Sequence, residues 1–98
     1  MLKTENIKEK LGEKSGQIKQ EFYVRQLGLF GSYVRDEQTE DSDIDILVDF
    51  EKGHKDFFNY MKLKDYLEQV LGREVDLVMK DAVKPRLREI ISKEVSYV

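Results

Sequence analysis

Two aspartates, Asp43 and Asp45, stand at the beginning of a segment whose apolar residues alternate along the chain. Aspartate is depleted in β-strands, so two of them in one strand require an explanation. Residues i and i+2 of a strand point to the same face and lie about 6.6 Å apart along the backbone. Carboxylates held that close repel each other unless one is protonated or a cation lies between them. Carboxylate oxygens suit Mg²⁺, so the pair predicts a magnesium site.

A third carboxylate, Asp76, lies in a later segment that is also predicted to be a strand, residues 74–79. If this strand neighbours the strand 43–50, its carboxylate can face the same point as Asp43 and Asp45. We therefore predict that these three aspartates bind metal at one site. Two metal ions about 3.5–4 Å apart can stabilise both the attacking and the leaving oxygen of an in-line displacement.

Gly31 and Ser32 supply the complementary half of such a site. Glycine lets the backbone approach a ligand closely, and Ser32 is predicted to open a short helix whose first N–H groups favour an anion. Arg35 would lie on the same helix face, where its guanidinium matches a phosphate. Ser42 is predicted to cap the entry to the strand, where it could also touch a phosphate. Together these residues fit a nucleoside triphosphate with Mg²⁺, and any of the five tyrosines could stack on its base.

The elements that must position these residues follow from the spacing of apolar side chains. Helices are predicted over residues 4–22, 56–71 and 84–93, and strands over 24–30, 43–50 and 74–79. Gly12 and Gly16 leave open whether the first helix is continuous or broken into two. Gly72 fits the end of the second helix and Pro85 the first turn of the third. The closing residues, VSYV, leave open a short strand or a tail. This order predicts an α/β (α+β) fold, a mixed β-sheet flanked by helices.

Composition limits the possible functions. The 98 residues predict one domain, with residues 1–22 as an N-terminal helical segment and 24–98 as the catalytic core. The net charge is −3 and no long basic stripe is present, so direct binding to DNA is not expected. The chain has no cysteine, which fits a reducing compartment, and no apolar run of membrane-spanning length. We therefore expect a cytoplasmic protein that does not bind membranes.

The pattern "GS", ten residues and then "DID", over residues 31–45, resembles the signature of the polymerase-β-like nucleotidyltransferases. In particular, the chain is similar to the minimal nucleotidyltransferases, which include the MntA-type antitoxins paired with HEPN toxins. The resemblance covers nearly the whole chain. It includes Asp76 on a later strand and the closing segment "KPRLREIISKEV", residues 84–95.

This resemblance implies a polymerase-β palm-like fold and a set of site residues. It implies that Asp43 and Asp45 bind Mg²⁺, that Gly31 and Ser32 hold the triphosphate, and that Asp76 completes the metal site and helps to activate the acceptor hydroxyl. Such enzymes transfer a nucleoside monophosphate to a hydroxyl and release pyrophosphate. In MntA-type systems the expected donor is ATP, and the acceptor is a tyrosine of the HEPN RNase toxin, which AMP transfer silences.

One position departs from the family pattern. Members often carry a small residue and a glycine on either side of the arginine, whereas Val34 and Asp36 flank Arg35 in this chain. Asp36 brings a negative charge next to the predicted phosphate site. The departure therefore concerns the predicted role of Arg35 and does not affect the predicted roles of the aspartates.

Two other functions remain open at this point. The chain could neutralise a helical toxin by occlusion alone, with a vestigial nucleotide site, although the three intact carboxylates favour a transferase. It could also modify a small molecule such as an aminoglycoside, but only 22 residues follow Asp76, too few for a separate substrate-binding domain. We expect so short a chain to act on an acceptor site that a partner protein provides. We therefore expect exposed apolar surface on the first or third helix.

Overall fold

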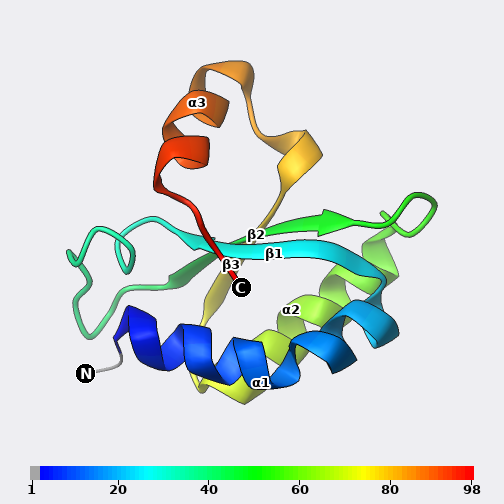
Figure 1. The fold of residues 1–98 in the computed structure, drawn as a ribbon, viewed down its shortest axis with the longest axis horizontal. Coiled ribbons are helices and arrows are strands. Elements are labelled where there is room, and N and C mark those ends of the chain that lie inside the picture. The colour runs from blue at the N-terminus through cyan, green and yellow to red at the C-terminus, as the bar shows by residue number, and fades with distance from the viewer. Residues whose placement is uncertain (1–2) are drawn as a thin grey trace.

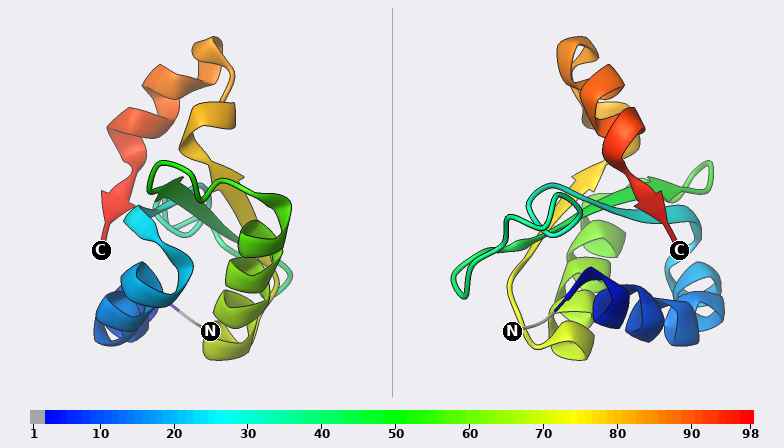
Figure 2. Two further views of the ribbon diagram at one scale, coloured as in Figure 1. Left: turned by 90° about the vertical axis from the view of Figure 1, so that its right-hand side faces the viewer. Right: turned by 60° about the vertical axis from the view of Figure 1, so that its left-hand side comes forward.

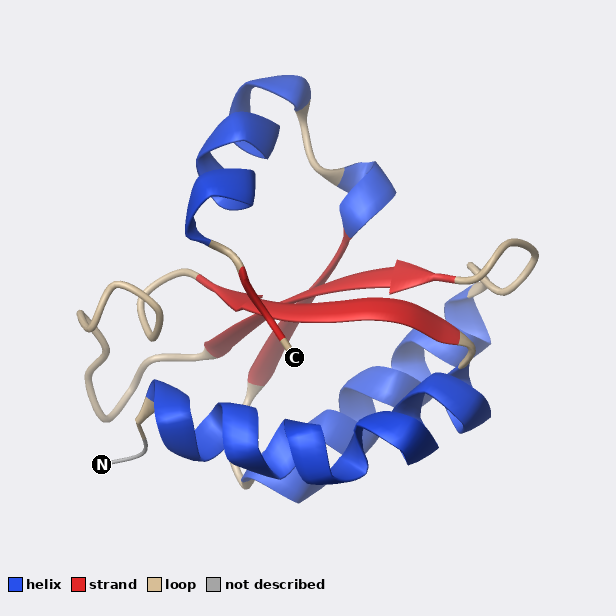
Figure 3. Ribbon diagram, in the orientation of Figure 1, coloured by secondary structure: helices blue, strands red, loops and turns tan. Residues whose placement is uncertain are grey.

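The structure, a computed structural model, describes residues 3–98 as a mixed sheet between helices (Figure 1). Its helices are α1 (Thr4–Phe22), α2 (Phe57–Leu71), α3 (Pro85–Glu94) and the short 3-10 helix η1 (Lys80–Ala82). Its strands are β1 (Val24–Phe30), β2 (Ile44–Phe50), β3 (Val75–Met79) and β4 (Ser96–Tyr97). Helices α1 and α2 cover one face of the sheet, and α3 stands over the other (Figure 3). Within this part of the chain, no helix is long and apolar enough to cross a bilayer.

The sheet has the strand order β3-β2-β1-β4. Strand β1 pairs antiparallel with β2 and with β4, whereas β2 and β3 are parallel. A parallel pair needs a crossover connection, which α2 provides across the face that it shares with α1. The mixed α/β architecture predicted from the sequence is therefore confirmed, and the closing residues form a short edge strand.

Helix α1 runs without a break through both of its glycines, Gly12 and Gly16. Each glycine costs roughly 1 kcal/mol relative to alanine in a helix interior. Burial of an apolar side chain is worth roughly 1.5–3 kcal/mol, which outweighs that cost. Four side chains of one stripe are buried in the core: Ile7, Leu11, Ile18 and Phe22. Of the two possibilities that the sequence left open, a continuous or a broken helix, the structure shows the continuous one.

Helix α2 begins and ends with specific caps. The Asp56 carboxylate accepts a hydrogen bond of 2.8 Å from the backbone N–H of Asn59, which satisfies one free donor of the first turn. Gly72 ends the helix in the left-handed conformation, with φ of 69°. The predicted helix, 56–71, is therefore correct to within one residue at its start.

The short helix predicted from Ser32 does not form. The chain makes a single turn instead, closed by hydrogen bonds from Arg35 N–H to Gly31 O (3.2 Å) and from Glu37 N–H to Ser32 O (2.9 Å). Asp36 adopts a left-handed conformation, with φ of 58°. Because this conformation reverses the chain, helical hydrogen bonding cannot continue beyond the turn. The N–H groups predicted to bind an anion therefore belong to a turn and not to a helix.

Candidate active site

The three predicted aspartates lie at one edge of the sheet, where β1 ends and β2 and β3 begin. The strand register pairs Asp45 with Phe30 of β1 on one side and with Asp76 of β3 on the other. Paired residues of neighbouring parallel strands project to the same face about 4.8 Å apart. Asp45 and Asp76 are therefore adjacent, and Asp43 precedes β2 by one residue. The condition under which the three carboxylates could face one point, that these two strands are neighbours, is therefore met.

Asp45 carries the electrostatic strain of this cluster. Its pKa is raised from 3.8 to about 6, first because the carboxylate is partly buried and then because Asp76 and Asp43 are negatively charged and close. A hydrogen bond from the backbone N–H of Ser32 offsets part of this effect. At neutral pH the neighbouring carboxylates therefore destabilise the ionised form of Asp45, an effect that a bound cation would offset.

Gly31 is held in contact with Asp45. Its φ of 79° is a left-handed conformation that side chains rarely adopt. A Cβ atom built on this residue would lie 2.0 Å from Oδ2 of Asp45, where no carbon fits. The glycine therefore lets the turn after β1 pass directly against the carboxylate. Its close approach to a bound ligand stays a prediction.

The donor set of the cluster fits a divalent cation. Among residues 3–98, no three acidic or histidine side chains already converge around one metal-sized point. Asp43 and Asp76 line a polar cavity of about 400 Å³ at the beginning of β3, and Asp45 lies beside them. Carboxylate oxygens are the ligands that Mg²⁺ prefers, and a cation would relieve the repulsion that Asp45 experiences. Asp45 and Asp76 are thus the best-placed pair of ligands for such a cation, and Asp43 lies next to them.

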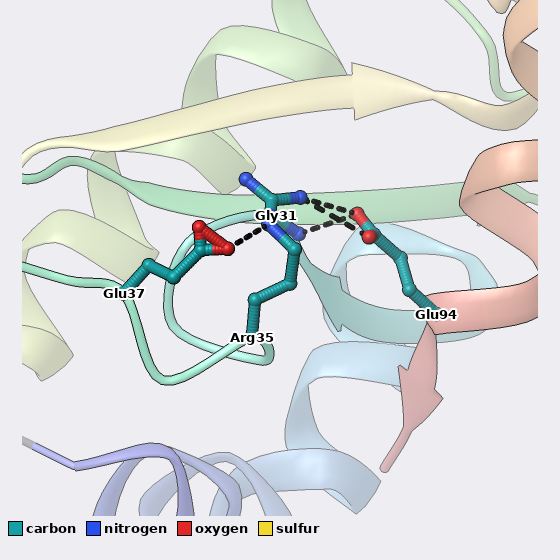
Figure 4. A network of polar contacts seen from close by, with 4 residues as sticks. All are labelled: Gly31, Arg35, Glu37 and Glu94. Atoms are coloured by element: carbon teal, nitrogen blue, oxygen red, sulfur yellow. Dashed lines mark hydrogen bonds and ion pairs between the residues drawn. The ribbon is translucent and has the colours of Figure 1, made fainter.

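Arg35 is engaged by two carboxylates (Figure 4). Its Nη1 donates to both oxygens of Glu94, at 3.2 and 3.1 Å, and its Nε donates to Glu37 at 3.0 Å. Glu94 also accepts a hydrogen bond of 2.9 Å from the backbone N–H of Gly31. These acceptors raise the pKa of Arg35. In this structure the guanidinium faces protein carboxylates, so contact with a phosphate would require an exchange of partners.

Glu94 is the participant that the sequence reasoning missed. It ends α3, where the helix dipole disfavours a carboxylate and favours a cation. An acidic residue at that position suggests a specific partner elsewhere. This signal was available in the sequence, but the identity of the partner, 63 and 59 residues away in Gly31 and Arg35, was not.

Ser42 closes the loop that leads into β2. Its Oγ accepts a hydrogen bond of 2.8 Å from the N–H of Thr39, and its own N–H donates to Thr39 O at 3.1 Å. The residue thus caps the entry to the strand, as predicted. Its contact with a phosphate stays a prediction.

A cavity of about 460 Å³ opens beneath α3, on the sheet face that carries the aspartates. Leu47, two residues beyond Asp45 and therefore on the same strand face, forms its floor. Apolar walls come from Val83, Ile91 and Tyr97. Lys80 and Arg88 add positive charge, and Asp81 adds a negative one. Tyr97 is the tyrosine that lines this cavity, whereas the buried Tyr33 belongs to the core on the other side.

Comparisons with known proteins agree with this geometry. The family model described as a nucleotidyltransferase domain matches residues 5–98. The chain is 45% identical over 98 residues to the protein adenylyltransferase MntA of Thermococcus cleftensis, an alignment that covers 100% of this chain and 98% of that protein.

Two solved structures share the fold. A structure assigned as a minimal nucleotidyltransferase matches with a TM-score of 0.83 and 33% identity, covering 97% of this chain and 95% of the other. A toxin–antitoxin crystal structure with AMP-PNP matches with a TM-score of 0.70 and 25% identity, covering 87% of this chain and 69% of the other. The chain therefore belongs to the nucleotidyltransferase domain family, as a minimal nucleotidyltransferase of the MntA protein adenylyltransferase type.

Proposed function

We propose that this nucleotidyltransferase uses Mg²⁺ to transfer AMP from ATP to a tyrosine hydroxyl of a HEPN-type toxin and thereby acts as an antitoxin. The observation that carries the proposal is the adjacency of Asp45 and Asp76 at the sheet edge, with the turn of Gly31 and Ser32 packed directly against Asp45. This arrangement places the predicted cation ligands next to the predicted phosphate ligands.

Each residue of the site has a proposed role. Asp43, Asp45 and Asp76 would hold the cation, the Ser32 hydroxyl would donate to the triphosphate, and Gly31 would let the turn approach the triphosphate closely. The bound cation would supply positive charge that stabilises the attacking and leaving oxygens. Arg35 and Ser42 stay predicted phosphate contacts.

The reaction needs no covalent intermediate on the protein. The acceptor oxygen attacks the α-phosphorus, the bond to the bridging oxygen breaks, and pyrophosphate leaves with that electron pair. Asp76, which is exposed, can accept the proton of the acceptor hydroxyl. Catalysis of this kind rests on positioning and charge neutralisation.

The cavity beneath α3 is the place that we propose for the nucleoside. It lies on the same sheet face as the aspartates, and its apolar floor and walls suit a base. Tyr97 can stack on the ring, and Arg88 can reach its polar edge. A triphosphate held at Gly31 and Ser32 would then extend across Asp45 towards Leu47.

The relatives support the choice of donor and partner. The Thermococcus cleftensis relative is named a protein adenylyltransferase, and the toxin–antitoxin structure contains AMP-PNP. Leu87 and Ile90 on α3 are 41% and 58% exposed, which matches the apolar surface that we expect on the third helix. A partner could therefore dock beside the site and present its hydroxyl.

The decisive experiment incubates the purified chain with Mg²⁺, ATP labelled at the α-phosphate, and the helical protein encoded beside it. An Asp43→Asn/Asp45→Asn variant runs in parallel. We expect label on the partner with the wild-type chain and at least a 100-fold loss, on the order of the contribution of a catalytic metal site, with the variant. A tight complex without label, after other nucleotides have been tried, would refute transfer and establish occlusion.

A further inference from the structure

Helix α3 is held to the rest of the molecule mainly at its ends. None of its ten residues, all of which the structure describes, is buried. Figure 2 shows the helix standing away from the sheet. Its residues Arg88, Ile91 and Ser92 line the cavity of about 460 Å³, together with Leu47 of β2. A helix without buried side chains gains little from apolar packing. Polar contacts at its C-terminal end therefore carry unusual weight in fixing its position.

Glu94 makes these contacts. Its carboxylate accepts one hydrogen bond from Gly31 N–H and two from Arg35 (Figure 4). Its side chain is only 18% exposed, although it belongs to a helix without any buried residue. Charge-assisted hydrogen bonds to a partly buried carboxylate are stronger than those between neutral groups. The contact is therefore a defined link between α3 and the turn after β1.

The same turn is held from its other side by a second carboxylate. The N–H of Ser32 donates to Asp45, whereas the N–H of Gly31 donates to Glu94. Glycine at φ of 79° has many other conformations available to it. Without Glu94, the turn would keep one of its two anchors and gain backbone freedom.

We infer that Glu94 is a positioning residue for nucleotide binding: it holds the turn of Gly31 and Ser32, directly and through Arg35, in the conformation that receives the phosphates. This inference rests on the proposed function. The inference differs from the proposed function because it assigns a role to α3 and not to the aspartates. The contrary possibility is that the Glu94 carboxylate occupies a phosphate position and must leave when the nucleotide binds.

The two possibilities predict opposite results for Glu94→Ala. Positioning predicts that the dissociation constant for ATP with Mg²⁺ rises about tenfold, as expected for the loss of one hydrogen bond to a charged group, while the transfer rate at saturating ATP changes less than about twofold. Competition predicts tighter binding. Calorimetric titration and initial-rate measurements separate the two. Unchanged or tighter binding would overturn the inference.

Glu89→Ala is the matched control. Glu89 lies on the same helix and forms an exposed ion pair of 3.2 Å with Lys93. Its removal changes the same charge on α3 without touching the turn, so ATP affinity should stay within about twofold of wild type. An equal loss of affinity in both variants would show a general charge effect and overturn the assignment to Glu94.

Two further variants test the mechanism of positioning. Glu94→Gln keeps an acceptor for Gly31 but removes the charge that faces Arg35, so its affinity should lie between those of wild type and Glu94→Ala. Arg35→Ala should add little to Glu94→Ala if both act through one link. Fully additive losses would mean that Arg35 acts on the nucleotide independently of Glu94.

Amide hydrogen exchange tests the link without any nucleotide. Gly31 N–H should exchange at least tenfold faster in Glu94→Ala than in wild type, because its acceptor is gone. Equal exchange rates would overturn the inference on their own. Failure of the wild-type chain to bind any nucleoside triphosphate would be a different result, since it would refute the proposed function.

Discussion

Asp45 is the residue at which the sheet, the turn and the predicted cation meet. Its backbone belongs to β2, its neighbours are Asp76 across the strand pair and Gly31 across the turn, and its carboxylate accepts the Ser32 N–H. The alternation of apolar residues alone predicted that Asp45 belongs to this strand. The tight contact with Gly31 required the antiparallel pairing of β1 with β2, which places the end of one strand beside the start of the other.

Asp45→Asn should stabilise the metal-free chain at neutral pH while abolishing transfer. The raised pKa means that the folded chain holds this proton more tightly than the unfolded chain does. The contribution of Asp45 to the free energy of unfolding is therefore present below pH 3.8 and lost as pH rises to about 6. We expect the variant to melt a few degrees higher at pH 7.5 and to lose this part of the pH dependence.

Thermal melts at pH 4 and pH 7.5, with and without Mg²⁺, check this expectation. Mg²⁺ should raise the melting temperature of the wild-type chain at pH 7.5 and leave that of Asp45→Asn unchanged. A variant that melts lower than wild type without metal would contradict the repulsion argument, and an equal response to Mg²⁺ would contradict the metal assignment.

Gly31→Ala should abolish nucleotide binding and cost about 1–3 kcal/mol in the free energy of unfolding, as expected for a strained left-handed residue. Its new Cβ would also collide with Asp45. Gly53→Ala is the matched control, since Gly53 has a similar φ of 87° but no atom within 4 Å of the built Cβ. Urea unfolding and ATP titration of both variants separate backbone strain from collision. Equal effects on ATP affinity would show that the contact with Asp45 is unimportant.

The elements themselves were largely predictable, because most of them have long apolar patterns. Helix α1 was predicted with its observed bounds, and the strands β1 and β2 to within one residue. The turn from Ser32 to Glu37 was not, since its form depends on one left-handed residue, Asp36, and on a distant carboxylate. Short segments whose contacts lie far away in the sequence carry little periodic signal of their own.

Exposed apolar side chains lie on α3, near the site, and at the start of α2, away from it. Leu87 and Ile90 lie on α3, above the face with the aspartates, whereas Phe57 and Phe58 begin α2. The α2 surface follows the far end of β2, roughly 16 Å along the strand from Asp45. A partner that offers a hydroxyl to the site should therefore dock on α3. The sequence led us to expect such a surface on the first or the third helix, and the exposed side chains of Leu87 and Ile90 place it on the third.

Ile90→Glu should weaken the complex with the proposed partner about tenfold or more, because it places a charge in an apolar contact, and should leave ATP affinity unchanged. Phe58→Glu is the control for the second surface and should leave the complex intact. Pull-down and calorimetry with the purified partner check both variants. A complex lost with Phe58→Glu and kept with Ile90→Glu would move the docking surface to α2.

At the scale of the whole molecule, the last strand of the described chain pairs with the first. Strand β4 pairs with β1, so residues 96–97 lie beside residues 28–29. The aspartates occupy the central part of the sequence, while the groups that hold the nucleotide turn come from β2 and from the end of α3. The site is therefore a property of the complete topology and not of the motif that first indicated it.

The link from Gly31 to Glu94 also has a consequence for the newly made protein. The two residues are 63 positions apart, so at roughly 5–20 residues per second a ribosome needs about 3–13 s to supply the carboxylate after it has supplied the glycine. Only after Asp76 has been added, 18 positions before Glu94, does a nascent chain contain every predicted metal ligand while it still lacks the second anchor of its turn. If Glu94 positions the nucleotide, a chain in which α3 has not yet been translated and folded binds ATP about tenfold more weakly than the finished protein does.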